Sequence, residues 1–129
     1  MGRFSTIVGL AILTLAMAGC TSSPKESARA VEALLEALVT RNEARYTALT
    51  CPDYEAQALI EYDSFGLVES ELKGVACAVA GSEGENSLVR CTGSIDATYG
   101  SEVRSFALAP RTYRVVVDSG EWLVCGYTK

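Results

Sequence analysis

The hydrophobic period of this chain changes once, near Gly66, and that change limits what it can fold into. Before Gly66, apolar residues recur at intervals of three and four, which is the period of an amphipathic helix. After it they alternate with polar residues, which is the period of a half-buried strand. Helices followed by strands are typical of an α+β domain. We therefore expect N-terminal helices packed on one face of an antiparallel sheet.

Three helical segments are predicted. The first begins at Ser23-Pro24-Lys25-Glu26, where a Ser N-cap, a Pro in the first turn and a Glu at N3 form a capping signal. Its apolar stripe consists of Ala28, Val31, Leu34, Leu35 and Leu38. A shorter helix is expected over 43–49, and a third from Pro52 to about Tyr62.

Four strands are predicted after Gly66. The first contains the alternating Val75, Cys77 and Val79, and the second runs over 89–99 with Cys91 on its buried face. The third covers 106–117, with a bulge at Pro110-Arg111 that would turn both of its apolar sets toward the core. The last strand, over 121–127, follows the turn Asp118-Ser119-Gly120.

The N-terminus carries an export signal. Arg3 is followed by an uncharged apolar run over 4–18, which is shorter than the ~20 residues a membrane-spanning helix needs. Met17-Ala18-Gly19-Cys20 resembles the lipobox of bacterial lipoproteins, in which the cysteine is lipidated and becomes the first mature residue; Met17 departs from the usual Leu. The alternative is ordinary cleavage after Ala18. We expect a signal peptide over 1–19, a lipid on Cys20 with a short tether over 20–23, and one domain over 24–129, held outside the cytoplasm.

Charge and composition exclude several classes. Loss of Arg3 with the signal changes the net charge from −5 to −6, which argues against a nucleic-acid partner. The chain has no His and no C-x₂-C pair, so we predict no zinc or other metal site. Nucleotide-binding glycine motifs and a serine nucleophile elbow are absent from the sequence, and no cofactor is expected.

The cysteine count predicts two disulfides. With Cys20 assigned to the lipid, four cysteines remain in an oxidising compartment. Reflection of the expected hairpin about Gly84 places Cys77 opposite Cys91, which leaves Cys51 with Cys125. A longer or offset turn would favour Cys51–Cys77 with Cys91–Cys125.

Helices followed by a bent antiparallel sheet, with Leu49-Thr50-Cys51-Pro52 at the helix end and Gly120-Glu121-Trp122 before Cys125, resemble the nuclear-transport-factor-2-like superfamily. The resemblance implies a cystatin-like α+β roll over about 24–127 and supports a Cys51–Cys125 bridge. It implies little about function, because the superfamily hosts enzymes, binders and scaffolds.

The lack of His removes the commonest general base, which leaves a carboxylate with tyrosines as the remaining catalytic chemistry. Candidate carboxylates are Asp63, Glu69, Glu71 and Asp96, and candidate pocket aromatics are Tyr54, Tyr62, Tyr99, Tyr113 and Trp122. These carboxylates are more often solvated charges, and these aromatics more often core. No catalytic residue is assigned. We predict a non-catalytic binding or interaction domain with an unknown protein or small-molecule partner; the alternative is a small enzyme of the polyketide-cyclase or isomerase type.

Overall fold

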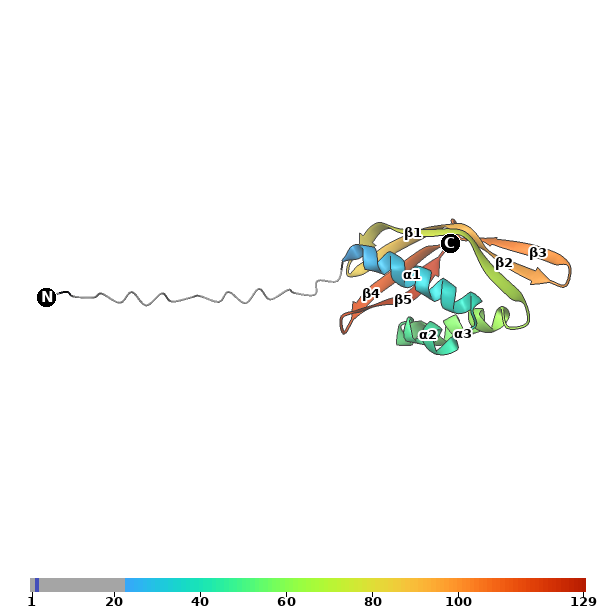
Figure 1. Ribbon diagram of the computed structural model, residues 1–129, viewed down its shortest axis with the longest axis horizontal. Coiled ribbons are helices and arrows are strands. Elements are labelled where there is room, and N and C mark those ends of the chain that lie inside the picture. Colours follow the sequence, from blue (N-terminus) through green and yellow to red (C-terminus); the bar gives the residue numbers. More distant parts are fainter. Residues whose placement is uncertain (1, 3–22) are drawn as a thin grey trace.

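The computed structural model describes residues 2 and 23–129, and in them a group of helices is followed by an antiparallel sheet (Figure 1). The elements are α1 (Pro24–Val39), α2 (Glu43–Ala48), the 3-10 turn η1 (Pro52–Tyr54), α3 (Glu55–Ser64), β1 (Glu69–Glu83), β2 (Asn86–Tyr99), β3 (Glu102–Ala107), β4 (Thr112–Asp118) and β5 (Glu121–Thr128). The predicted α+β class is confirmed.

Helix α1 forms as its sequence predicts and supplies one wall of the core. Ser23 is its N-cap, and the Ser23 hydroxyl accepts a hydrogen bond from the Lys25 N–H at 3.4 Å. All five residues of the predicted stripe are buried. On the flank of the helix, the Glu32 carboxylate accepts the Cys77 N–H at 2.9 Å and ties α1 to β1.

The sheet has five strands where the sequence predicted four. Strand β2 pairs with β1 along one edge, while β3 and β4 share its other edge, β3 beside residues 94–99 and β4 beside residues 87–90. Strand β5 extends the sheet beyond β4. The predicted bulge near Pro110-Arg111 is a complete break between β3 and β4, because residues 108–111 leave the ladder in a turn closed by the Arg111 N–H and the Leu108 carbonyl.

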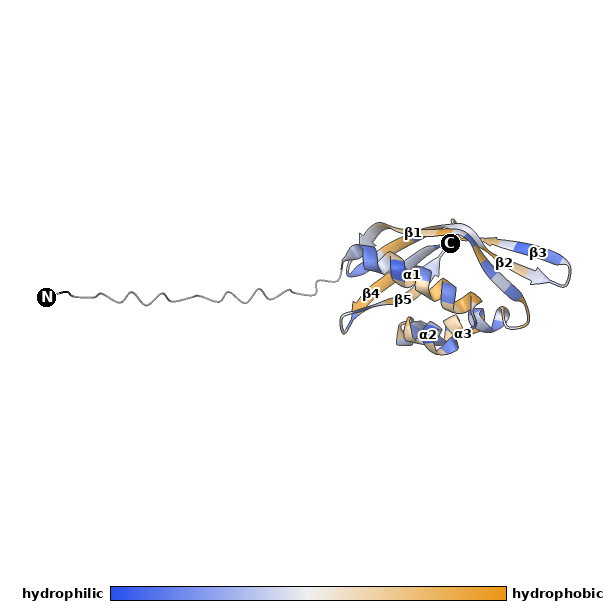
Figure 2. Ribbon diagram, in the orientation of Figure 1, coloured by the Kyte–Doolittle hydropathy of each residue, from blue (hydrophilic) through white to orange (hydrophobic). Residues whose placement is uncertain are grey.

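The break buries only part of the two apolar sets that were expected to face the core. Leu108, Tyr113 and Val115 are buried, whereas Phe106 and Val117 remain partly exposed. Strand β3 projects beyond the helices (Figure 1), and Phe106 packs edge-on against Phe65, at 5.6 Å between ring centroids. Figure 2 shows the hydrophobic colour gathered on β4, β5 and the C-terminal half of α1, with β3 largely hydrophilic.

Four cysteines lie in two pairs at disulfide distance. Cys77 and Cys91 are register partners in the β1–β2 hairpin, with Cα atoms 4.0 Å apart. Cys51 and Cys125 have Cα atoms 5.0 Å apart and join the start of η1 to β5. Two backbone hydrogen bonds, from the Cys51 N–H to Val124 and from the Val124 N–H to Leu49, hold the same junction.

The core lies between α1 and the concave face of the sheet. Its fully buried members include Val31, Val89, Ile95, Val115 and Val124, each contributed by a periodic position of its element. None of the helices in the described part of the chain is long and apolar enough to cross a bilayer.

Candidate functional site

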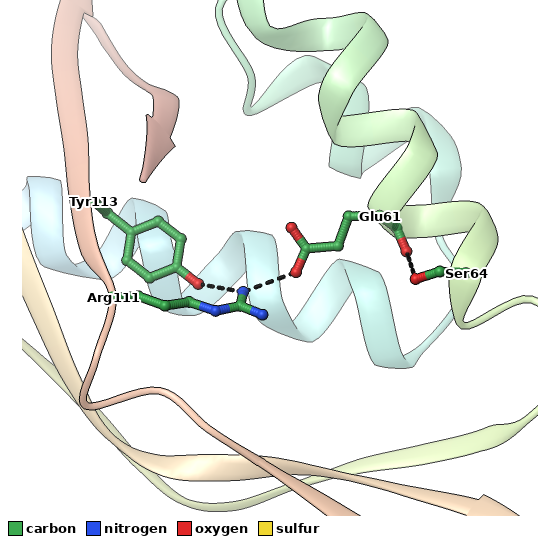
Figure 3. A network of polar contacts seen from close by, with 4 residues as sticks. All are labelled: Glu61, Ser64, Arg111 and Tyr113. Carbon is green, nitrogen blue, oxygen red and sulfur yellow. Dashed lines mark hydrogen bonds and ion pairs between the residues drawn. The ribbon is translucent and has the colours of Figure 1, made fainter. Parts of the chain in front are cut away.

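A buried polar network lies where α3 meets the start of β4 (Figure 3). The Arg111 Nη1 atom donates to Glu61 Oε1 at 2.7 Å and to the Tyr113 hydroxyl at 3.0 Å. The Arg111 and Glu61 side chains are only 9% and 17% exposed. The guanidinium carbon also lies 4.2 Å from the centroid of the Tyr127 ring, close enough for a cation–π contact. A charge pair is thus enclosed in an aromatic setting.

The break in the sheet places Arg111 in this network. Residues 108–111 turn inward, and the buried Leu108 and Tyr113 hold the segment on both sides. On α3, Ala58 and Tyr62 face the core, whereas Glu61 lies beside them on the flank that faces β4 and β5. The Ser64 hydroxyl donates to the Glu61 carbonyl at 2.6 Å in the last turn of α3. The Glu61–Arg111 ion pair therefore joins two segments that are 50 residues apart in the sequence, α3 and the turn before β4.

A pocket of about 420 Å³ opens beside the network. It is lined by Tyr54, Gln57, Ile60, Glu61, Ser64, Arg114, Gly126 and Tyr127. Its volume lies in the range of small-molecule sites, about 300–1,000 Å³. Glu61 lines the pocket whereas Arg111 does not, so the acidic member of the ion pair faces the opening.

Gly126 permits the close approach of two lining residues. Its φ is +118°, in the region that favours glycine, and a Cβ there would lie 3.4 Å from Arg114 Nη2 and 3.4 Å from the Tyr54 ring. Arg114 is exposed and donates at 3.4 Å to the Cys125 carbonyl. Among the ion pairs of residues 23–129, none includes Arg114.

The ionisable groups of the site influence one another. Burial raises the pKa of Tyr54 and of Tyr127, and the Glu61 carboxylate raises both further. Burial raises the pKa of Tyr113 to about 12, although Arg111 opposes the shift. For Arg111, burial alone would lower the pKa, but Tyr113 and Glu61 outweigh burial and raise it. At neutral pH the tyrosines are therefore protonated and Arg111 is charged.

The carboxylates suggested by the sequence do not meet in this pocket. Asp63, Glu69 and Glu71 are exposed, and Glu71 pairs with the equally exposed Lys73 at 3.1 Å. Asp96 accepts hydrogen bonds from Ser105 and then Ser94, and these lower the pKa of its carboxyl. All four lie outside the pocket lining.

The five suggested aromatics are dispersed. Tyr54 lines the pocket and Tyr113 belongs to the network behind it. Tyr62 is buried against Tyr46, with Arg41 stacked 3.7 Å from its ring centroid. Tyr99 is partly exposed near the β2–β3 turn, and Trp122 lies by the N-terminal half of α1.

Sequence reasoning missed Glu61, Arg111 and Tyr127. The available signal was Arg111 itself, a charged residue inside a predicted bulge between two apolar segments, because bulges often re-aim side chains beside functional sites. Glu61 and Tyr127 carried no comparable signal, since each sits on an ordinary helix or strand.

The described residues contain no group of three or more His, Cys, Asp or Glu side chains that could hold a metal ion. Cys20, the expected lipid attachment site, lies outside the described residues. In comparisons with protein-family models, curated proteins and solved structures, the chain has no match.

Proposed function

We propose that this chain is a bacterial lipoprotein, anchored outside the cytoplasm through a lipid on Cys20, and that its domain is a non-catalytic binding module of the cystatin-like roll type seen in the nuclear-transport-factor-2-like superfamily. Support comes from the lipobox sequence, from two cysteine pairs at disulfide distance, and from helices packed on one face of an antiparallel sheet. The partner is a small molecule or a protein side chain that fits the pocket beside Glu61.

One observation carries the binding role: the only carboxylate lining the pocket is already paired. Glu61 Oε1 accepts from Arg111 at 2.7 Å, so one of its two oxygens is engaged in an ion pair before any ligand arrives. A general base needs an oxygen free to accept the substrate's proton, and Glu61 Oε1 is already occupied by the Arg111 guanidinium. The arrangement suits recognition better than proton abstraction.

The anchor is tested on protein extracted from membranes. Intact-mass analysis is expected to show a chain that begins at Cys20 and carries acyl groups, and Cys20→Ser is expected to release the protein from the membrane fraction. An unmodified N-terminus at Gly19 would contradict the anchor.

The pocket is tested by native mass spectrometry of the mature chain mixed with a small-molecule extract. A compound retained unchanged by the wild type should be lost in Ile60→Trp, because Ile60 lies on the exposed rim and an indole there covers the opening. Leu67→Trp, at a fully exposed position outside the pocket, is the matched control. Chemical conversion of the compound would favour the enzyme alternative, and retention by Ile60→Trp would exclude this pocket.

A further inference from the structure

We infer that the pocket beside Glu61 binds a primary alkylammonium group, presented either by a free small amine or by a lysine side chain of a partner protein. The inference rests on the proposed binding function and names the chemistry of the ligand. Three features of the pocket point to a cation with N–H donors: the orientation of the ion pair, the aromatic walls and the remaining acceptor capacity.

The ion pair has its negative end toward the opening. Glu61 lines the pocket, while Arg111 lies behind it against Tyr113 and Tyr127. A charged group entering the pocket is therefore closer to the carboxylate than to the guanidinium, and the nearer charge dominates at short range. The pKa of Tyr54 indicates the same net negative influence in the pocket, because Glu61 raises that pKa by more than Arg111 lowers it.

The walls favour a cation as well. Tyr54 and Tyr127 both line the pocket, and the face of an aromatic ring attracts an ammonium or guanidinium group. Arg111 already lies over Tyr127, so the ring takes part in one such contact within the fold. A bound alkyl chain would contact the same rings and Ile60 with its methylene groups.

The remaining acceptor capacity favours a primary ammonium over a quaternary one. Glu61 Oε1 accepts from Arg111, and the Tyr127 hydroxyl also hydrogen-bonds the Glu61 carboxylate. A carboxylate accepts about four hydrogen bonds and a phenol oxygen accepts as well as donates, so Glu61, Tyr54 and Tyr127 can still accept from a ligand. A primary ammonium has three N–H donors to offer, and a quaternary ammonium has none.

At the rim of the pocket, Arg114 carries a positive charge and so repels a cationic ligand, whereas Glu61 attracts it. Its guanidinium is exposed and therefore screened by solvent, so it repels a cation at the floor only weakly. Because it forms no ion pair within the described residues, it can also take an acceptor carried at the outer end of the ligand.

Three isosteric probes test the inference on the wild-type mature chain: n-butylammonium, n-butanol and butyrate, titrated by amide NMR. Shifts are expected at Gln57, Gly126 and Tyr127, with n-butylammonium binding at least about tenfold more tightly than the other two. Glu61→Gln should abolish that preference, Arg114→Gln should keep or increase it, and the exposed control Glu71→Gln should leave it unchanged.

Other outcomes would overturn the inference. These are equal or tighter binding of n-butanol or butyrate, a preference that persists in a folded Glu61→Gln variant, or no shift at the pocket amides with any probe. The comparison of probes on the wild type stands even where Glu61→Gln unfolds. A butyrate preference would still leave a binding pocket, and an unlipidated Cys20 would remove the anchor alone, so failure of this inference is distinguishable from failure of the proposed function.

A second arm separates the two sources of the cation. Nα-acetyl-lysine methylamide represents a lysine within a protein, and its Nε-acetylated form is the uncharged control. Tighter binding than n-butylammonium assigns the pocket to a protein lysine whose backbone carbonyls reach Arg114, and weaker binding assigns it to a free amine. Equal binding by the Nε-acetylated form would overturn the inference.

Discussion

At the scale of single residues, Arg111 depends on two partners for its burial. A buried guanidinium is costly unless its donors and its charge are satisfied, and here Glu61 and Tyr113 supply both. Such pairs add little net stability compared with apolar packing, but removing one partner leaves an uncompensated charge. The network is thus better explained by what it presents to the pocket than by the stability it contributes.

Arg111→Met is expected to lower the free energy of unfolding by about 3–5 kcal/mol, because Glu61 loses its buried partner. Adding Glu61→Gln in the same chain should recover part of the loss by removing the orphaned charge. Glu102→Gln breaks the exposed Arg104–Glu102 pair, which spans 3.5 Å, and is the matched control with an expected cost of at most about 1 kcal/mol. Urea unfolding measures all three variants; equal costs for the two pairs would contradict the burial argument.

Tyr113 should make stability fall at alkaline pH. Its pKa is raised from 10.0 to about 12, so below pH 10 the phenol is protonated in both folded and unfolded chains and its stabilisation is complete. Between pH 10 and 12 the unfolded chain releases the proton while the folded chain keeps it. The free energy of unfolding is therefore expected to decline through this window, and Tyr54 and Tyr127 act in the same direction.

Urea unfolding at a series of pH values checks this decline. Tyr113→Phe should be less stable at pH 8, because Arg111 loses an acceptor, and should show a shallower decline above pH 10. A parallel decline in the wild type and in Tyr113→Phe would show that this phenol is not responsible.

At the scale of elements, the β1–β2 hairpin bends where its register shifts between Lys73 and Ala76. Opposite the shift, Gly93 has a φ of +86°, and a Cβ there would overlap the carbonyl oxygens of Lys73 and Gly74. Bulges of this kind bend a strand and increase its twist. Gly93 therefore allows the two strands to curve together toward the helices.

Gly93→Ala is expected to cost at least about 2–3 kcal/mol, since it combines a left-handed φ with a backbone clash. Gly81→Ala lies in the same hairpin with no atom within 4 Å of its Cβ, and it is expected to change stability by less than about 1 kcal/mol. Thermal unfolding compares the two variants, and a tolerated Gly93→Ala would mean that the bend is not fixed by this residue.

The two cysteine pairs should contribute unequally to the free energy of unfolding. Their sequence separations are 14 and 74, and in the chain-entropy model a longer loop gives the larger stabilisation, about 3 kcal/mol for a 15-residue loop and about 4.7 for 100 residues. Replacing Cys51 and Cys125 by Ser is therefore expected to destabilise more than replacing Cys77 and Cys91. Urea unfolding of the two double variants measures which pair contributes more to stability.

Peptide mapping without reductant checks the connectivity itself. The expected products link Cys77 to Cys91 and Cys51 to Cys125. A peptide that links Cys51 to Cys77 would reverse the assignment.

Local patterns in the sequence were sufficient for elements whose residues decide their own environment. The stripe of α1 and the alternation in β2 are properties of consecutive residues, and both hold in the structure. The split of one expected strand into β3 and β4 was missed because β2 is long enough to pair with two strands in turn, which is a tertiary relationship. The Glu61–Arg111 pair escaped prediction for the same reason, since contact between α3 and residues 108–111 has no local signature.

At the scale of the whole molecule, α1 begins at Pro24, only four positions after Cys20. At ~3.5 Å per residue, a lipid on Cys20 would hold the start of α1 within roughly 14 Å of the bilayer. The β1–β2 and β4–β5 turns lie at this same end of the domain (Figure 1), whereas the pocket lies along α3, away from the start of α1.

The fluorescence of Trp122, the only tryptophan in the sequence, can test whether the end of the domain at the start of α1 faces the bilayer. It lies beside the start of α1, lining a groove with Pro24 and Val79. In vesicles containing brominated lipid, its fluorescence is expected to be quenched in the lipidated chain and not in Cys20→Ser. Equal emission from both proteins would mean that the anchored domain stands away from the membrane.

The Cys51–Cys125 pair also bears on the order in which the two crosslinks can form. It joins residues 74 positions apart, one at the start of η1 and one in β5, so its thiols meet only after the last strand has joined the sheet. The Cys77–Cys91 pair can close earlier, because its residues are 14 positions apart within a single hairpin. A folding intermediate without β5 in place would therefore hold one crosslinked hairpin and an open Cys51, and its thiol would be the one that a labelling reagent captures.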